Sequence, residues 1–173
     1  MKTVTGDIWT LATSVDAVVV ATNVGWKKET GIGIMGRGLA LQAAQRFGWL
    51  KKAWGEHCQA EREMTGPVYW RVNSKWCRYL ICAPTKALCE KEPWRSWQFD
   101  STIEFIVRQL PGLASIADAT EAYAKRVAEP VPLIYVPSLG CANGGLEEDV
   151  VLPVMQKYLV HPSFIHVRYA DGK

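Results

Sequence analysis

The stretch VPSLGCANGGLEEDVVLPVM, residues 136–155, contains the change of pattern on which the fold assignment depends. An apolar, β-branched run ends at its start, three glycines and an asparagine follow, and the apolar residues then recur at helical spacing. We therefore expect a strand over Val131–Val136, a tight loop and a helix over Glu147–Leu159. Glycine lets the backbone approach a ligand closely, and backbone N–H groups beside a helix N-terminus bind anions. The stretch predicts a strand–loop–helix unit with an anion-binding loop.

A second segment repeats this arrangement near the N-terminus. The apolar run Asp16–Thr22 predicts a buried strand, the sequence GIGIMGRG occupies residues 31–38, and Arg37–Phe47 has the spacing of a helix. The two loops together contain seven of the 14 glycines. Two such loops facing each other suit a diphosphate. The P-loop pattern is absent, and the G-x-G-x-x-G match at Gly31 lacks the acidic residue that a dinucleotide-binding fold places about 20 residues later.

The order of the remaining elements predicts the fold class. Strands and helices alternate along the chain, and several strands are apolar throughout. This favours a three-layer α/β/α sandwich around a mixed central sheet, in one domain over residues 1–173. In such sheets ligands bind beyond the carboxyl ends of the strands, where both glycine loops lie. The other expected strands are Lys2–Thr5, Pro67–Val72, Arg78–Ala83 and Phe164–Tyr169, and the other expected helices are Leu50–Glu63, Ser96–Leu110 (ended by Pro111 and Gly112) and Leu113–Ala128.

Composition favours a cytoplasmic monomer with no membrane partner. No apolar run reaches the roughly 20 residues of a membrane-spanning helix, and the first residues lack the apolar core of a signal peptide. The five cysteines form no C-x-x-C pair and the three histidines are scattered, so we expect reduced thiols, structural histidines and neither a metal nor a cofactor. Cys141 stands apart because it lies in the second glycine loop.

The distribution of charge and tryptophan leaves two interpretations open. Residues 1–100 contain 14 Lys and Arg against 9 Asp and Glu, whereas residues 101–173 contain 6 against 8. All eight tryptophans fall in the first hundred residues, several beside basic residues. Interleaved aromatic and basic side chains are typical of surfaces that bind single-stranded nucleic acid. The alternative is a set of core tryptophans with solvated basic neighbours.

Four ordered pieces of the chain resemble the macro domain family, which binds ADP-ribose. They are Gly6-Asp7-Ile8, the strand that ends at Asn23, the glycine loop 31–38 and the loop 137–145. The resemblance implies that Asp7 receives the adenine amino group, that Asn23 contacts the distal ribose, and that the two loops enclose the diphosphate. The ligand-binding residues that it implies are Asp7, Ile8, Asn23, Gly33, Ile34, Met35, Gly36, Gly38, Ser138, Leu139, Gly140, Cys141, Ala142, Asn143 and Gly144.

Within that family the chain is most similar to the branch of the DNA ADP-ribosyl glycohydrolase DarG and the terminal ADP-ribose protein glycohydrolase. The similarity rests on GIMGRGLALQ (33–42), Pro84-Thr85-Lys86 and SLGCANGGL (138–146). It implies catalysis by Lys86 with Glu147 as the acidic partner, although Glu147 also suits a helix N-terminus, and Glu148 and Asp149 are alternatives. The family commonly has glycine where this chain has Ala142, which the loop tolerates if its φ is negative.

The resemblance implies an ADP-ribosyl glycohydrolase. Its expected substrate is thymidine-linked ADP-ribose on single-stranded DNA, and a DarT-like toxin is an expected partner. Two alternatives remain open: a module that binds ADP-ribose without hydrolysis, and a hydrolase of small derivatives such as ADP-ribose 1''-phosphate or O-acetyl-ADP-ribose.

Overall fold

Residues 1–169, which the computed structural model describes, contain a six-stranded sheet with the strand order β1-β6-β5-β2-β4-β3. Only β3 runs antiparallel to its neighbour in the sheet, so the sheet is mixed, as the sequence predicts. The strands are β1 (Lys2–Thr5), β2 (Ala17–Asn23), β3 (Val68–Arg71), β4 (Tyr79–Lys86), β5 (Ile134–Pro137) and β6 (Phe164–Arg168).

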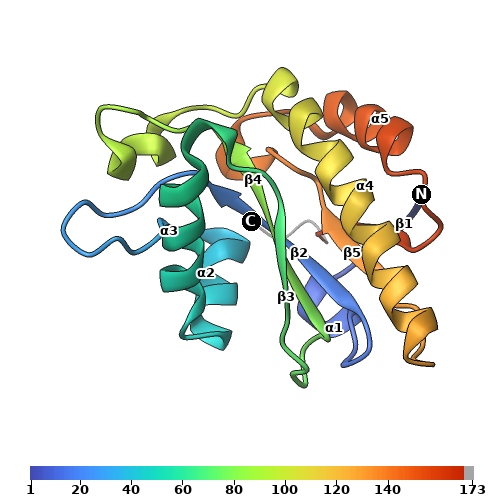
Figure 1. The fold of residues 1–173 in the computed structure, drawn as a ribbon. Helices are drawn as coiled ribbons and strands as arrows, with labels where there is room; N and C mark the ends of the chain where they lie inside the picture. The colour runs from blue at the N-terminus through green and yellow to red at the C-terminus, as the bar shows by residue number, and fades with distance from the viewer. Residues whose placement is uncertain (170–173) are drawn as a thin grey trace.

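Helices cover both faces of the sheet, which confirms the three-layer sandwich (Figure 1). On β2, Val18 and Val20 pack against one layer, and Ala17 and Val19 pack against the other. The alternation follows from the pleat of a strand, which points successive side chains to opposite faces. The first layer contains α1 (Ile8–Leu11), α2 (Gly38–Arg46) and α3 (Leu50–Glu61), and the second contains α4 (Ile103–Arg126) and α5 (Glu148–Tyr158).

The expected break at Pro111 and Gly112 is wrong, because α4 continues through both residues. Proline cannot donate a backbone hydrogen bond, so an isolated helix would weaken here. Leu110 and Leu113, on either side, are fully buried in the same hydrophobic core cluster. A Cβ atom on Gly112 would lie only 2.9 Å from the Pro67 ring, so this part of the helix packs closely against the segment before β3. Tertiary packing overrides the local signal.

The helix expected from Ser96 begins later, at Ile103. Thr102 caps it by accepting a hydrogen bond from the Phe105 N–H at 3.2 Å. The preceding residues Pro93–Gln98 form the short 3₁₀ helix η2 instead. The sequence reading also missed α1, a single turn that Asp7 caps. Two further 3₁₀ turns, η1 (Arg62–Met64) and η3 (Ala142–Gly144), complete the described elements.

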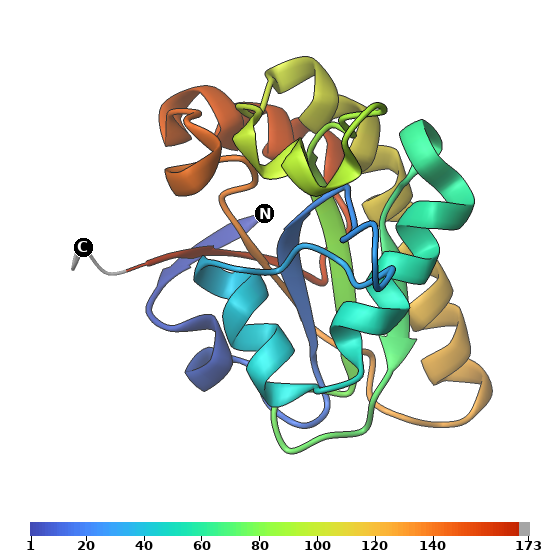
Figure 2. The ribbon, with the colours of Figure 1, turned by 90° about the vertical axis from the view of Figure 1, so that its left-hand side faces the viewer.

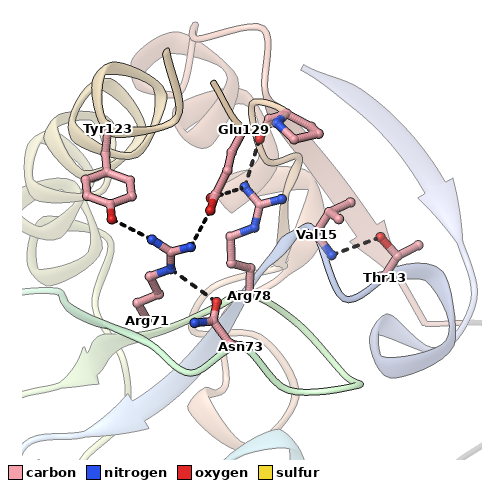
Figure 3. Close-up of polar contacts among 8 residues, drawn as sticks. Thr13, Val15, Arg71, Asn73, Arg78, Tyr123 and Glu129 are labelled. Carbon is pink, nitrogen blue, oxygen red and sulfur yellow. Dashed lines mark hydrogen bonds and ion pairs between the residues drawn. The ribbon is translucent and has the colours of Figure 1, made fainter. Parts of the chain in front are cut away.

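A charged network joins the end of α4 to β3 and β4 (Figure 3). Glu129 accepts from Arg71 at 2.6 Å and pairs with Arg78 at 3.2 Å, and Arg71 also donates to the Tyr123 hydroxyl at 2.6 Å. Arg71 pairs in register with Tyr79, the first residue of β4, so the network lies at the end of the sheet opposite Lys86. The network joins α4 to the sheet at this end and so has a structural role.

None of the helices over residues 1–169 is both long and apolar enough to span a bilayer.

Candidate active site

A cavity of about 1400 Å³ opens at the carboxyl ends of β2, β4 and β5. Figure 2 shows η2 and the segment that leads into α5 gathered at one end of the sheet. The walls come from both glycine loops, the segment after η2, α2 and the end of β6. The lining residues include Asn23, Ile34, Gly36, Arg37, Gly38, Gln42, Lys86, Trp97, Gln98, Asp100, Ser138, Gly140, Cys141, Ala142, Asn143, Gly144, Glu148, Asp149, Arg168 and Tyr169.

Register in the sheet places Asn23 beside Lys86 at the cavity. The two residues are paired on the adjacent parallel strands β2 and β4, after a register shift that follows Thr22. Lys86 is therefore the last residue of the strand itself, whereas the sequence reading placed it just past a strand that ended at Ala83. The structure thus brings together the polar side chains that two separate motifs supply.

Lys86 is held by its surroundings in a defined position. Its side chain is only 7% exposed, and its Nζ donates a hydrogen bond to the Trp97 carbonyl oxygen at 3.1 Å. Burial lowers the pKa of the Lys86 ammonium, and the negative charge of Asp100 partly opposes that change. A lysine with a lowered pKa reaches its neutral, nucleophilic form at a lower pH than a surface lysine does.

Asp100, and not Glu147, is the acid that acts electrostatically on Lys86. Asp100 lines the cavity, and the neighbouring Ser101 N–H donates to the Gly144 carbonyl at 2.8 Å, which ties its segment to the second glycine loop. Glu147 is the exposed N-cap residue of α5 and is not among the lining residues. Glu148 lines the cavity but accepts a hydrogen bond from Arg168 at 2.7 Å.

The second glycine loop turns sharply through left-handed backbone at Gly140 (φ +77°) and Gly145 (φ +80°). Ala142 also has a positive φ, +54°, so the condition under which the loop would tolerate alanine without strain is not met. Ala142 is the first residue of the turn η3, in which the Gly145 N–H donates to the Ala142 carbonyl at 3.1 Å. A left-handed alanine costs roughly 1–2 kcal/mol, and its exposed methyl group meets no crowding from the core.

Some residues of the first glycine loop line the cavity, and others pack in the core. Ile34, Gly36 and Gly38 line the cavity. Gly33 instead packs against Trp54 of α3, and Met35 is only 2% exposed, so these two predicted ligand residues support the loop from behind. A Cβ atom on Gly38 would lie 3.4 Å from the Asn143 amide nitrogen, which shows that the two loops approach each other. The N-terminus of α2 and the Arg37 side chain make this side of the cavity suited to an anion.

The end of β6 and the residue after it line the cavity, whereas the predicted ligand residues at the start of α1 do not. Asp7 accepts a hydrogen bond from the Trp9 N–H at 3.0 Å, and Ile8 is fully buried; neither is among the lining residues. Tyr169 does line the cavity, and its pKa is raised to about 12 by burial and by the negative charge of Asp7. The electrostatic interaction places Asp7 near an aromatic ring that faces the cavity.

Ser138 and Leu139 have different roles in the chain that leads to the second loop. Leu139 is fully buried in the core, whereas Ser138 lines the cavity. The Ser138 hydroxyl forms a 2.8 Å hydrogen bond with Nε2 of His166, whose Nδ1 contacts the Thr3 hydroxyl at 3.2 Å. Burial lowers the pKa of His166. His166 therefore positions Ser138.

Cys141 lines the cavity but is poorly suited to be a nucleophile. Burial, together with the negative charges of Glu148 and Glu147, raises the pKa of its thiol to about 11. Because the thiolate is the reactive form, little of it exists near neutral pH. All five cysteines are free, and residues 1–169 hold no cluster of three or more His, Cys, Asp or Glu side chains placed to bind a metal ion.

The sequence reading missed Asp100, Trp97, Gln98 and Tyr169 as cavity residues. Tyr169 follows the last strand at its carboxyl end, where ligands bind in α/β sheets, so its position carried a signal. The other three lie in a segment that the apolar spacing assigned to a helix. Only the folded chain brings that segment against Lys86.

Neither a protein-family model nor a curated protein matches the sequence. Solved structures do match. The macrodomain of Mycobacterium tuberculosis DarG superposes with a TM-score of 0.71 at 22% identity, covering 99% of this chain and 97% of that one. The macrodomain of Thermus aquaticus DarG has a TM-score of 0.66 at 24% identity with the same coverage. Thermosipho africanus DarTG, solved in complex with ADP-ribose, has a TM-score of 0.68 at 20% identity, and this chain spans 43% of its length.

Proposed function

We propose that this chain, which has the macrodomain fold, binds ADP-ribose in the 1400 Å³ cavity and hydrolyses its bond to a modified macromolecule. The observation that carries the proposal is the position of Lys86, buried at the carboxyl end of β4 between Asn23 and the Trp97–Asp100 segment. Residues 1–173 would form a single macro domain.

The cavity has a chemically distinct region for each part of ADP-ribose. The two glycine loops and the N-terminus of α2 supply backbone N–H groups for the diphosphate. Tyr169 supplies an aromatic face for adenine, and Asp7 lies nearby with acceptor capacity beyond the N–H group that it caps. Asn23 and Lys86 would then contact the distal ribose. The complex of Thermosipho africanus DarTG with ADP-ribose supports this choice of ligand.

Lys86 would act at the anomeric carbon of the distal ribose. Hydrolysis adds water across the glycosidic bond: the hydroxyl joins the anomeric carbon, and the leaving group departs with a proton. The lowered pKa of Lys86 suits it to one of two roles. It can attack that carbon as a neutral amine and displace the leaving group, after which water breaks the new C–N bond and regenerates the lysine, or it can transfer the proton while water attacks directly. Loops that fix the diphosphate would hold the anomeric carbon within reach, which lowers the entropic part of the barrier.

Asp100 is the better placed acidic partner for this chemistry. Both carboxylates are exposed, but Asp100 lines the cavity and interacts electrostatically with Lys86, whereas Glu147, the candidate from the sequence, does not line it. A carboxylate beside the lysine stabilises its protonated form, and so tunes the pH at which the amine becomes neutral.

The proposed substrate is thymidine-linked ADP-ribose on single-stranded DNA, and a DarT-like toxin is the proposed partner. The likeness to two DarG macrodomains supports both choices. Among the tryptophans of the first hundred positions, Trp9, Trp26 and Trp54 are buried in the core, whereas Trp97 is exposed at the cavity, where it is compatible with a DNA strand.

The test is time-resolved release of ADP-ribose from a thymidine-modified single-stranded oligonucleotide. Wild type should release it, and Lys86→Ala should slow release by at least about 100-fold, the usual range for losing a general acid or base. Lys91→Ala is a matched control, because Lys91 is exposed and does not line the cavity. Calorimetry should show that Lys86→Ala still binds ADP-ribose. Full turnover by Lys86→Ala would refute its catalytic role.

The same assay separates the two alternative functions. ADP-ribose binding without release from DNA or protein substrates would indicate a binding module. Hydrolysis restricted to ADP-ribose 1''-phosphate or O-acetyl-ADP-ribose in a substrate panel would indicate a hydrolase of small derivatives.

A further inference from the structure

The segment 97–100, which comprises the end of η2 and the two residues after it, exposes aromatic side chains beside Lys86. Trp97 is 51% exposed and Phe99 is 41% exposed, although large aromatic side chains are mostly buried in folded proteins. Trp97, Gln98 and Asp100 all line the cavity. Trp97 is therefore an exposed aromatic residue that also lines the cavity, a position in which a ligand can cover its ring.

Both ends of this segment are fixed. Ser96 is fully buried, and its hydroxyl accepts from the Cys89 N–H at 2.9 Å and donates to the Pro93 carbonyl at 3.0 Å. At the other end, Ser101 is 5% exposed and its N–H donates to Gly144. The exposed residues between these anchors therefore lie on a rigid support.

The backbone of Trp97 is attached to the proposed reaction centre. Its carbonyl oxygen accepts the hydrogen bond from Lys86 Nζ at 3.1 Å. The group that leaves the anomeric carbon must pass close to the same Nζ. Trp97 also lines the cavity and is exposed, so this residue lies on the leaving-group side of Lys86, whereas the region assigned to adenine lies by Asp7 and Tyr169.

We infer that Trp97 and Gln98 form a subsite for an unstacked nucleobase on the leaving-group side of the distal ribose. Stacking on an aromatic face is the main way in which proteins hold bases of single strands. The Gln98 amide both donates and accepts, so it can pair with the polar edge of a base. This inference rests on the proposed function and narrows its substrate to nucleic acid.

The chemistry of the segment disfavours a modified protein as the substrate. An ADP-ribosylated glutamate or serine presents a short aliphatic linker that gives the indole no ring to stack on. The same subsite that strengthens binding of a modified nucleotide should leave binding of a modified peptide unchanged.

The experiment measures equilibrium binding in the Lys86→Ala background, which prevents turnover. A thymidine-modified oligonucleotide, free ADP-ribose and an ADP-ribosylated glutamate peptide are titrated in turn. Adding Trp97→Ala should weaken oligonucleotide binding by about 10- to 100-fold, equivalent to ~1.4–2.8 kcal/mol, the range of stacking on one base. Binding of ADP-ribose and of the peptide should be unchanged.

Two further variants separate stacking from folding. Trp97→Phe should restore most of the oligonucleotide affinity, because a phenyl ring can still stack on a base. Trp49→Ala is the matched control: Trp49 is 42% exposed and lies outside the cavity lining, so its removal should change none of the three affinities.

Two results would overturn the inference. One is an oligonucleotide affinity that Trp97→Ala leaves unchanged. The other is an equal loss of affinity for all three ligands, which would mean that Trp97 supports the ADP-ribose site itself. Because these are binding measurements, they stand apart from the release assay. Failure of wild type to release ADP-ribose refutes the proposed hydrolysis and not the subsite.

Discussion

Replacing Gly55 by alanine should destabilise the protein, although the same change inside most helices stabilises it. Gly55 lies in the middle of α3 and faces the first glycine loop. A Cβ atom there would lie 2.0 Å from the Gly31 carbonyl oxygen and 2.6 Å from the Gly33 nitrogen. Both are backbone atoms, and ordinary contact begins near 3.4 Å, so the loop must move by about 1.4 Å.

The clash outweighs the gain in helix propensity. Alanine gains about 1 kcal/mol over glycine in a helix interior. Overpacking against a fixed neighbour costs about 1–3 kcal/mol, and moving the loop also weakens the 2.8 Å hydrogen bond from Gly33 N–H to the Lys51 carbonyl, worth about 1 kcal/mol. We expect a net loss of about 1–3 kcal/mol, which for a domain of this size lowers Tm by about 2–12 °C.

Thermal unfolding and calorimetry together test this prediction. Because the displaced loop lines the cavity, affinity for ADP-ribose should fall by about 10-fold or more. Gly48→Ala is the matched control, since a methyl group added to Gly48 would meet no heavy atom within 4 Å and Gly48 is outside the cavity; Tm and affinity should stay near wild type. A Gly55→Ala protein with a raised Tm and unchanged affinity would refute the packing of α3 against the loop.

Three other perturbations have expected outcomes. Asp100→Asn removes a charge that raises the pKa of Lys86, so the limb of the pH–rate profile that Lys86 controls should move to lower pH. Glu147→Gln should leave that limb in place. The reverse result would assign the acidic role to Glu147. Because the pKa of the Cys141 thiol is raised to about 11, it should react with iodoacetamide at pH 8 roughly 100-fold more slowly than an ordinary thiol. Rapid alkylation would contradict the burial of this thiol. Cys141→Ser should keep the affinity for ADP-ribose within about twofold of wild type. His166 has a folded pKa below its unfolded value of about 6.5, so the unfolded chain takes up the proton first as pH falls. Its contribution to stability is complete above that pH and is lost as pH falls toward the folded pKa. Tm should therefore drop more between pH 7 and 5 in wild type than in His166→Gln, and equal drops would show that His166 does not titrate in this way.

Local patterns in the sequence were sufficient to predict the strands of the sheet and the two glycine loops. Apolar runs in the sequence marked β2 and β5, whose residues are mostly buried, and the turns after them follow from glycine chemistry. The wrong helix break at Pro111 has a tertiary cause. Pro111 ends a helix in isolation, but burial of its neighbours on both sides holds α4 together. The positive φ of Ala142 occurs in the turn that the loop adopts.

Only part of the site could be predicted from the sequence, because only some of its residues belong to recognisable motifs. Lys86, Asn23 and the glycines were found in motifs. Asp100 and Trp97 have no motif of their own, and their segment is held beside Lys86 by the Lys86–Trp97 hydrogen bond and by the bond from Ser101 to the distant Gly144. No local pattern encodes such contacts, so tertiary structure was needed to find these residues.

The most direct test of the central claim is a crystal structure of the Lys86→Ala protein with ADP-ribose. The account predicts the diphosphate between the loops 31–38 and 140–145, adenine beside Tyr169, and the distal ribose within hydrogen-bonding reach of Asn23 and open toward Trp97. ADP-ribose bound outside this cavity, or bound in it with the distal ribose at the Tyr169 end, would contradict the account.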